Sequence, residues 1–189
     1  MINKIKAKDR VSAVLERSGS AVEKVLMSSR WEWEHWRKGK LIDSWLEKNI
    51  CTDEGLTHVL DVAFSAATQI ASWYVAVYNT NTTAAAGMTY ATPVFTEATN
   101  YAGSRPAWQE AGVAAKSITN AANKASFTFS SAATIYGGVT VGGGSAATTP
   151  GDAAGGGVLY NVSAFTGGAK SVASDDVLKV TVALTITDA

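Results

Sequence analysis

The residues of this 189-residue chain that could carry out acid–base chemistry are few and widely separated. An acid–base site would have to draw on Asp152, Asp175, Asp176 and His58. Asp175 and Asp176 are adjacent carboxylates, but they directly precede the last apolar segment of the chain, where a solvent-exposed turn is expected. No second ligand stands at metal-binding spacing from His58, which we expect on the polar face of a helix. Because nothing in the sequence assembles these groups, we expect a protein that is not an enzyme.

Signals for a nucleophile, a phosphate site or a cofactor are also missing. The single cysteine, Cys51, cannot form an intrachain disulfide and has no histidine motif beside it, so we interpret it as a small residue at a strand-to-helix junction. The glycine-rich stretches 142–144 and 155–157 lack the following Lys-Ser/Thr of a phosphate-binding loop. No Gly-x-Ser-x-Gly sequence occurs. We therefore expect no cofactor and no metal.

Composition and charge favour a folded protein without a nucleic-acid or membrane partner. Hydrophobic residues make up 47% of the chain, which excludes general disorder. Residues 1–50 carry eleven Lys/Arg and seven Asp/Glu, whereas residues 51–189 carry five Lys/Arg and nine Asp/Glu. The net charge of the chain is zero, but its N-terminal part is therefore basic. Five basic residues are too few for a nucleic-acid groove in the body. No apolar run approaches the roughly 20 residues of a membrane span, and no signal-peptide pattern begins the chain.

The front of the chain is predicted to be an N-terminal helical arm. Apolar residues at three- and four-residue spacings predict helix over residues 4–28, with a narrow apolar stripe. Ser18 and Gly19 weaken its middle, which indicates two short helices or one kinked helix. We expect residues 1–30 to be an arm that lies on another surface, of its own domain or of a neighbour; a solvated polar helix is the alternative. The stripe consists of Val11, Val14, Leu15, Val22, Val25 and Leu26.

A β-hairpin is predicted to follow the arm. Side chains alternate over residues 31–36, which is typical of a strand with one solvated face. Residues 37–40 read as a turn in which Gly39 is free to adopt positive φ, and residues 41–48 as the returning strand. One face of the first strand carries Trp31, Trp33 and His35, and the other carries Glu32, Glu34 and Trp36.

Four of the six tryptophans of the chain fall in this hairpin. Trp31 and Trp33 share one face of the first strand, and with Trp45 of the returning strand they are expected to be buried. Trp36 lies on the polar face, so it is our candidate for an aromatic contact with a partner. With the arm residues Val14, Leu15, Val22, Val25 and Leu26 it completes our set of candidate partner contacts.

The rest of the chain predicts one helix and several strands. Residues 53–66 show helical spacing of apolar side chains, and Thr52 or Asp53 can cap the helix. Strands are predicted over 69–78, 124–130, 133–141, 158–165 and 177–187. Loops are predicted over 79–87 and 142–157, and the loop 142–157 is expected to be flexible because it has no side chains to pack. Gly137 and Gly138 indicate a bulge or a close backbone approach.

This order of elements predicts a mainly β fold. We expect an antiparallel β-sandwich, jelly-roll-like, with one internal helix and the N-terminal helical arm. A parallel α/β sheet is disfavoured because helices do not recur between the strands. The predicted domains are the arm, residues 1–30, and the β-sandwich, residues 31–189.

Several stretches resemble a family of small virion structural proteins of tailed bacteriophages. The resemblance covers about residues 31–189 and rests on the amino-acid sequences of several motifs and on the order in which they occur. They are Glu54-Gly55-Leu56-Thr57-His58-Val59-Leu60-Asp61-Val62-Ala63, Thr68-Gln69 to Trp73-Tyr74-Val75, Ser104-Arg105-Pro106-Ala107-Trp108, Ser117-Ile118-Thr119-Asn120, Phe127-Thr128-Phe129 and Ala133-Thr134-Ile135-Tyr136-Gly137. The first 30 residues depart from the pattern of this family, which leaves the role of the arm open.

The resemblance implies a capsid decoration or cement protein. Such a protein binds the outer surface of the capsid and bridges neighbouring major capsid protein subunits, commonly as a homodimer or homotrimer. It is made in the host cytoplasm and located on the virion, with no nucleic-acid or membrane partner.

Two other functions stay open at this point. One is a tail, collar or head-fibre component of the same virion. The other is a carbohydrate-binding β-sandwich, which needs a solvent-facing aromatic row and would draw on Trp108, Tyr101 and Tyr90.

Overall fold

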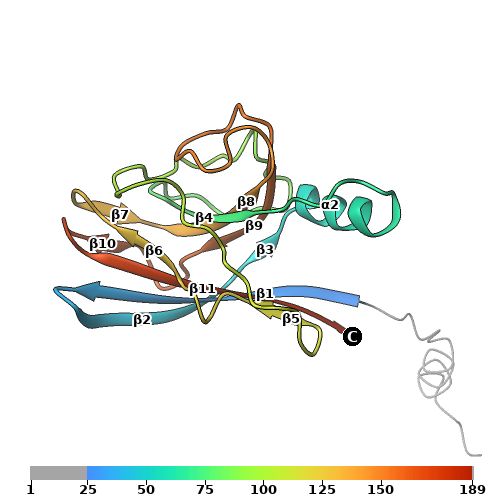
Figure 1. Cartoon of the computed structure of the whole chain (residues 1–189). Coiled ribbons are helices and arrows are strands. Elements are labelled where there is room, and N and C mark those ends of the chain that lie inside the picture. The colour runs from blue at the N-terminus through green and yellow to red at the C-terminus, as the bar shows by residue number, and fades with distance from the viewer. Residues whose placement is uncertain (1–24, 189) are drawn as a thin grey trace, which may run out of the picture.

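The computed structural model describes residues 25–188, which form two antiparallel β-sheets packed face to face, with one helix at one end (Figure 1). The predicted fold class, a mainly β antiparallel sandwich with one internal helix, is confirmed for these residues. Most of the predicted arm lies outside them.

The lower sheet of Figure 1 has five strands, in the order β2-β1-β11-β5, with β6 also paired to β11. β11 is the central strand because it pairs with β1 along one edge and with β5 and β6 along the other. The predicted hairpin is confirmed, and Lys38 and Gly39 at its tip both have positive φ, 49° and 74°. The strands are β1 (Val25–Arg37), β2 (Lys40–Lys48), β5 (Ser117–Thr119), β6 (Ala125–Thr128) and β11 (Val177–Asp188).

β1 begins earlier than the sequence predicts. The helix expected to run to residue 28 is wrong for residues 25–28, which pair with residues 185–188 of β11. Helix propensities differ by less than about 1 kcal/mol per residue, so a continuous ladder to a long partner strand outweighs them. Val25 and Leu26 therefore stand at the start of a strand rather than on a helix face.

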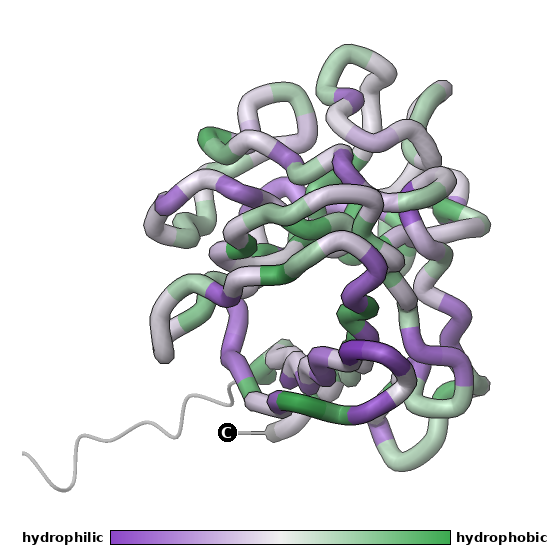
Figure 2. The backbone as a smooth tube through the Cα atoms, turned by 90° about the vertical axis from the view of Figure 1, so that its left-hand side faces the viewer, coloured by the Kyte–Doolittle hydropathy of each residue, from purple (hydrophilic) through white to green (hydrophobic). Residues whose placement is uncertain are grey.

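The upper sheet has four strands, in the order β3-β9-β8-β4. Hydrophobic clusters pack against both of its faces. Its inner face carries Val75 and Val77 of β4 and meets Trp31 and Trp33 of β1 in the main core, as predicted for these tryptophans. Figure 2 shows hydrophobic, green segments passing through the middle of this upper half. The strands are β3 (Ile50–Cys51), β4 (Trp73–Tyr78), β8 (Gly137–Gly142) and β9 (Val158–Ala164).

The outer face of the upper sheet lies under long loop segments. Met88, Tyr90 and Phe95 from the segment after β4 pack on Val139 and Val141 of β8 in a second core. The loop 142–157, which was predicted to have nothing to pack, also closes over this face: Ala147 is buried and its carbonyl oxygen is hydrogen-bonded to Arg105. That prediction is wrong because the partners of the loop come from distant segments.

Helix α2 (Asp53–Phe64) follows the short strand β3, and Cys51 stands at this junction as predicted. Thr52 caps the helix by accepting a hydrogen bond from the Gly55 backbone N–H at 3.0 Å. Gly55 allows close packing on β9, since a Cβ atom there would lie 2.5 Å from the Tyr160 carbonyl oxygen. The rest of the helix is less buried: Leu60 and Phe64 of its apolar stripe are 59% and 83% exposed.

The short strands β7 (Ala133–Ile135) and β10 (Lys170–Val172) form a separate two-stranded sheet beside the sandwich. Strands β3, β5 and β10 were not predicted, because two or three residues show no measurable alternation.

Candidate functional site

The four groups singled out for acid–base chemistry do not share partners. Asp152 accepts a hydrogen bond from the Tyr90 hydroxyl at 2.7 Å, and His58 lies edge-on to Trp73. Asp175 is exposed with φ of 65°, whereas Asp176 is buried with other partners. Among residues 25–188, no three His, Cys, Asp or Glu side chains converge as a metal-binding group.

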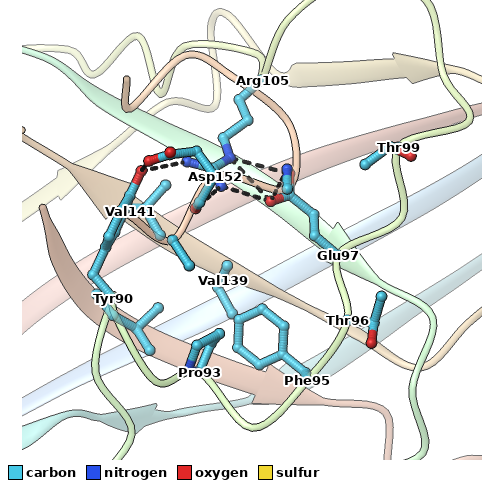
Figure 3. A pocket seen from close by; sticks show the side chains of 13 residues that line it. Tyr90, Pro93, Phe95, Thr96, Glu97, Thr99, Arg105, Val139, Val141 and Asp152 are labelled. Atoms are coloured by element: carbon cyan, nitrogen blue, oxygen red, sulfur yellow. Dashed lines mark hydrogen bonds and ion pairs between the residues drawn. The ribbon is translucent and has the colours of Figure 1, made fainter. Parts of the chain in front are cut away.

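Ionisable side chains do converge beside one pocket, of about 330 Å³, on the outer face of the upper sheet (Figure 3). The guanidinium of Arg105 and the carboxylate of Glu97 are both buried there and approach to 2.6 Å. Burial works against the charge of Arg105, but the hydrogen bonds and charge of Glu97 outweigh it and raise the pKa of Arg105. No sequence pattern predicted this cluster; the signal was an arginine inside a segment with few basic residues.

Arg105 is fully used by the protein itself. Its Nε donates to Glu97, Nη1 donates to the Tyr90 hydroxyl and the Ala147 carbonyl oxygen, and Nη2 donates to Glu97 and the Asp152 carbonyl oxygen, at 2.6–3.1 Å. A guanidinium has five N–H donors, and these contacts occupy them. We therefore interpret the cluster as a structural tie between three loops rather than a ligand site.

A second ion cluster lies at the hairpin end of the lower sheet; its carboxylate and imidazole are buried, whereas its guanidinium is half-exposed. Asp176, before β11, accepts hydrogen bonds from Arg37 Nε at 2.7 Å and Nη2 at 2.7 Å, and its Oδ2 lies 2.8 Å from His35 Nε2. The hydrogen bonds of Arg37 are the main reason that the pKa of Asp176 lies well below its usual range. The exposed turn predicted for Asp175-Asp176 is thus right for Asp175 and wrong for Asp176, because two residues of β1 reach the second carboxylate.

An apolar groove of about 360 Å³ lies between α2 and the two sheets. Trp73 and Tyr160 of the upper sheet and Trp108 form aromatic parts of its wall, and Ile118 and Leu184 come from the lower sheet. The helix contributes His58, Val59, Val62 and Ala63. The buried hydroxyl of Thr140 also lines the groove.

Large apolar side chains are exposed at two further places in the fold. We call Leu56, Leu60 and Phe64, which follow one another at four-residue spacing on α2, the helix-end surface. We call Leu41 and Ile42 of β2, next to the hairpin turn in the edge strand of the lower sheet, the hairpin surface; Leu46 is exposed farther along β2, opposite Glu32. In Figure 1 the tip of the hairpin and α2 lie at opposite ends of the molecule.

The predicted contact residues fall in three places. Val14, Leu15 and Val22 lie outside the described residues. Val25 and Leu26 are exposed, 71% and 52%, although on a strand. Trp36 is on the outer face of β1 as predicted, but it is half-buried: its indole N–H donates to Glu34 at 2.9 Å, and Lys179 Nζ lies 4.6 Å from the ring centroid.

The aromatic row considered for carbohydrate binding does not face solvent. All three side chains are buried: Tyr90 belongs to the second core, and Tyr101 and Trp108 belong to the main core. Tyr90 and Tyr101 hydroxyls bind Asp152 and Glu97, and the Trp108 indole N–H donates to the Val182 carbonyl oxygen. A sugar ring cannot stack on side chains that other residues cover, so this row is wrong as a binding surface.

No helix within residues 25–188 has the length and apolarity to cross a bilayer. A scan against protein-family models found no match, and a search of curated proteins found no relative.

Proposed function

We propose that this protein is a structural component of a tailed-bacteriophage virion that binds the outer surface of the capsid and cements neighbouring major capsid protein subunits. The observation that carries the proposal is the presence of two apolar surfaces, the helix-end surface and the hairpin surface, at opposite ends of one sandwich. A protein that bridges two subunits needs two separate contact surfaces on one body. The major capsid protein is proposed as the partner because the sequence motifs resemble those of phage virion proteins.

The chemistry of these surfaces supports contact with protein. Burying one large apolar side chain is worth about 1.5–3 kcal/mol, so Leu60 and Phe64 together can supply a substantial share of a moderate affinity. β2 offers an unpaired strand edge besides its apolar side chains, and such edges accept strands from other chains. Weak contacts suffice for a cement protein, because many copies act together on one particle.

The proposal includes self-association as a homodimer or homotrimer on the capsid surface. The edge strand β2 gives the chain a means of contacting a second copy. A tail, collar or head-fibre location remains the alternative for the same two surfaces, and it differs in where the copies sit on the particle.

The experiment is rebinding to capsid shells from which the protein has been stripped. Wild-type protein is expected to saturate the shells and raise their temperature of rupture. Changing both Leu60 and Phe64 to Asp should weaken shell binding by more than about tenfold, because 1.4 kcal/mol corresponds to a factor of ten. Leu41→Asp, beside the hairpin turn at the other end of the molecule, should leave partial binding but remove the gain in rupture temperature.

Val94→Asp is the matched control, since Val94 is an exposed valine on neither surface and its φ of 60° suits Asp. It should bind like wild type. Shells that neither bind the wild-type protein nor rupture later with it would refute the cement role. Fluorescently labelled protein confined to one vertex would favour the tail or collar alternative.

A further inference from the structure

We propose that the segment before β1 docks on its own domain, with the apolar stripe of residues 11–22 in the groove between α2 and the sheets. The inference goes beyond the capsid role and uses different residues. It selects one of the two arrangements that the sequence allows for the arm, contact with its own domain.

The groove is shaped for an apolar helix face. Its walls are mainly aromatic or aliphatic: Trp73 and Tyr160 come from the upper sheet, Leu184 from the lower sheet, and Val59 from the helix. Four polar side chains also line it, His58, Gln69, Glu110 and Thr140, and Glu110 is the one carboxylate among them. A space of about 360 Å³ accepts one or two large aliphatic side chains, and it falls in the usual range for binding pockets.

One polar atom in this groove needs a partner. Thr140, on β8, is 2% exposed, and its hydroxyl has no hydrogen-bond partner among the described residues. Leaving a buried hydroxyl unpaired costs about 1–3 kcal/mol. The occupant of the groove should therefore be apolar but carry a hydroxyl or another hydrogen-bonding group near its centre.

The chain leaves the described fold beside the groove. Met27, two residues after the start of β1, receives a hydrogen bond on its sulfur from the Tyr160 hydroxyl at 2.7 Å, and Tyr160 lines the groove. Met27 also pairs with Ile186, two residues beyond Leu184 of the groove wall. Twenty-four residues precede Val25, which is ample length to reach back to this wall.

The sequence of the segment matches this need. The sequence allows two short helices or one kinked helix; if residues 11–22 form the kinked helix, Val14, Ser18 and Val22 follow one another at four-residue spacing along one face, and Val11 and Leu15 flank them. Ser18 thus places one hydroxyl in the middle of an apolar stripe. A helix of this length measures roughly 18 Å, the same as the twelve residues of α2, so the two can lie alongside each other.

Hydrogen exchange of the full-length protein tests the proposal. Isolated helices of about 12 residues are marginal in water, so slow exchange in residues 11–22 would report docking rather than local helix formation. We expect these amides to exchange at least tenfold more slowly than in a free peptide of the same sequence. Leu15→Asp should remove the protection without unfolding the sandwich, whereas Ser20→Asp, on the opposite helix face, should keep it.

A disulfide experiment identifies which copy fills the groove. Leu15→Cys combined with Ala63→Cys, in a Cys51→Ser background, should form an intramolecular disulfide, and Leu15→Cys with Val113→Cys should not. Cross-linking only between chains would assign the groove to another copy and overturn the proposal. Unprotected amides in residues 11–22 of the wild-type protein would overturn it as well. Neither readout involves capsids, so the inference and the cement role can fail independently.

Discussion

The indole ring of Trp33 lies directly against the backbone of Gly138: a Cβ atom on Gly138 would stand 2.7 Å from Cη2 of Trp33. Trp31 approaches the same position to 2.9 Å, and the two indoles are stacked with centroids 5.5 Å apart. The two sheets therefore meet where β8 has no side chain and β1 presents two of its three tryptophans. The sequence predicted a bulge or a close backbone approach at Gly137-Gly138, and the close approach is what the structure contains.

Gly138→Ala is expected to destabilise the protein by about 1–3 kcal/mol, because the added methyl group overpacks the indole rings. Gly112→Ala is the control, since nothing lies within 4 Å of its Cβ position. Urea unfolding followed by tryptophan fluorescence measures both. Equal stability of the two variants would show that the sheets can separate without cost.

Asp176→Asn should lower the free energy of unfolding by about 3 kcal/mol, because it leaves His35 and Arg37 without their buried carboxylate. Since the pKa of Asp176 is lowered in the folded protein, its contribution is present above the unfolded value of about 3.9 and is lost as pH falls further. The wild-type protein should therefore lose stability below about pH 4 more steeply than Asp176→Asn.

Asp175→Asn is the matched control for this prediction, because Asp175 is exposed and Asn tolerates its positive φ. Unfolding free energies measured from pH 2 to pH 7 separate the two variants. Parallel pH profiles for wild type and Asp176→Asn would argue against the ion cluster.

Glu97→Gln and Arg105→Lys should each cost about 3–5 kcal/mol, because each breaks a buried ion pair and leaves a charge or several donors without partners. Hydrogen exchange should rise in residues 143–157, which Arg105 holds through two carbonyl oxygens. Glu110→Gln, at an exposed position, serves as the control. Shell binding per folded molecule should not change; a selective loss of binding would make this pocket a functional site.

Thr52→Ala should destabilise the protein by about 1–2 kcal/mol, since Thr52 caps α2 and also donates from its hydroxyl to the Leu159 carbonyl oxygen. Thr57→Ala, exposed on the same helix, should be close to neutral. Thermal unfolding monitored by circular dichroism compares the two. A neutral Thr52→Ala would mean that α2 is held by its packing on β9 alone.

The elements that sequence predicted well are those with a sustained period. β11 alternates along its whole length and α2 repeats at helical spacing behind a capping threonine, so local pattern and tertiary role agree. The first residues of β1 were mistaken for helix because their partner is β11, at the other end of the chain.

The side-chain clusters could not be predicted for the same reason. His35 and Asp176 are 141 residues apart in sequence, and Arg105 contacts segments on both sides of it, up to residue 152. Each of these residues reads as an ordinary surface charge until the topology brings its partner close. The exposure of the apolar side chains of α2 could not be predicted either. An apolar stripe predicts that a helix face is buried, but it does not identify the surface that covers it.

The central claim, a cement role on the capsid, is tested most directly by the stoichiometry of this protein relative to the major capsid protein in purified particles. Quantitative mass spectrometry of intact virions should give many copies per particle, at a fixed ratio to the capsid protein that repeats between preparations. A handful of copies per particle, or none at all, would contradict the cement role.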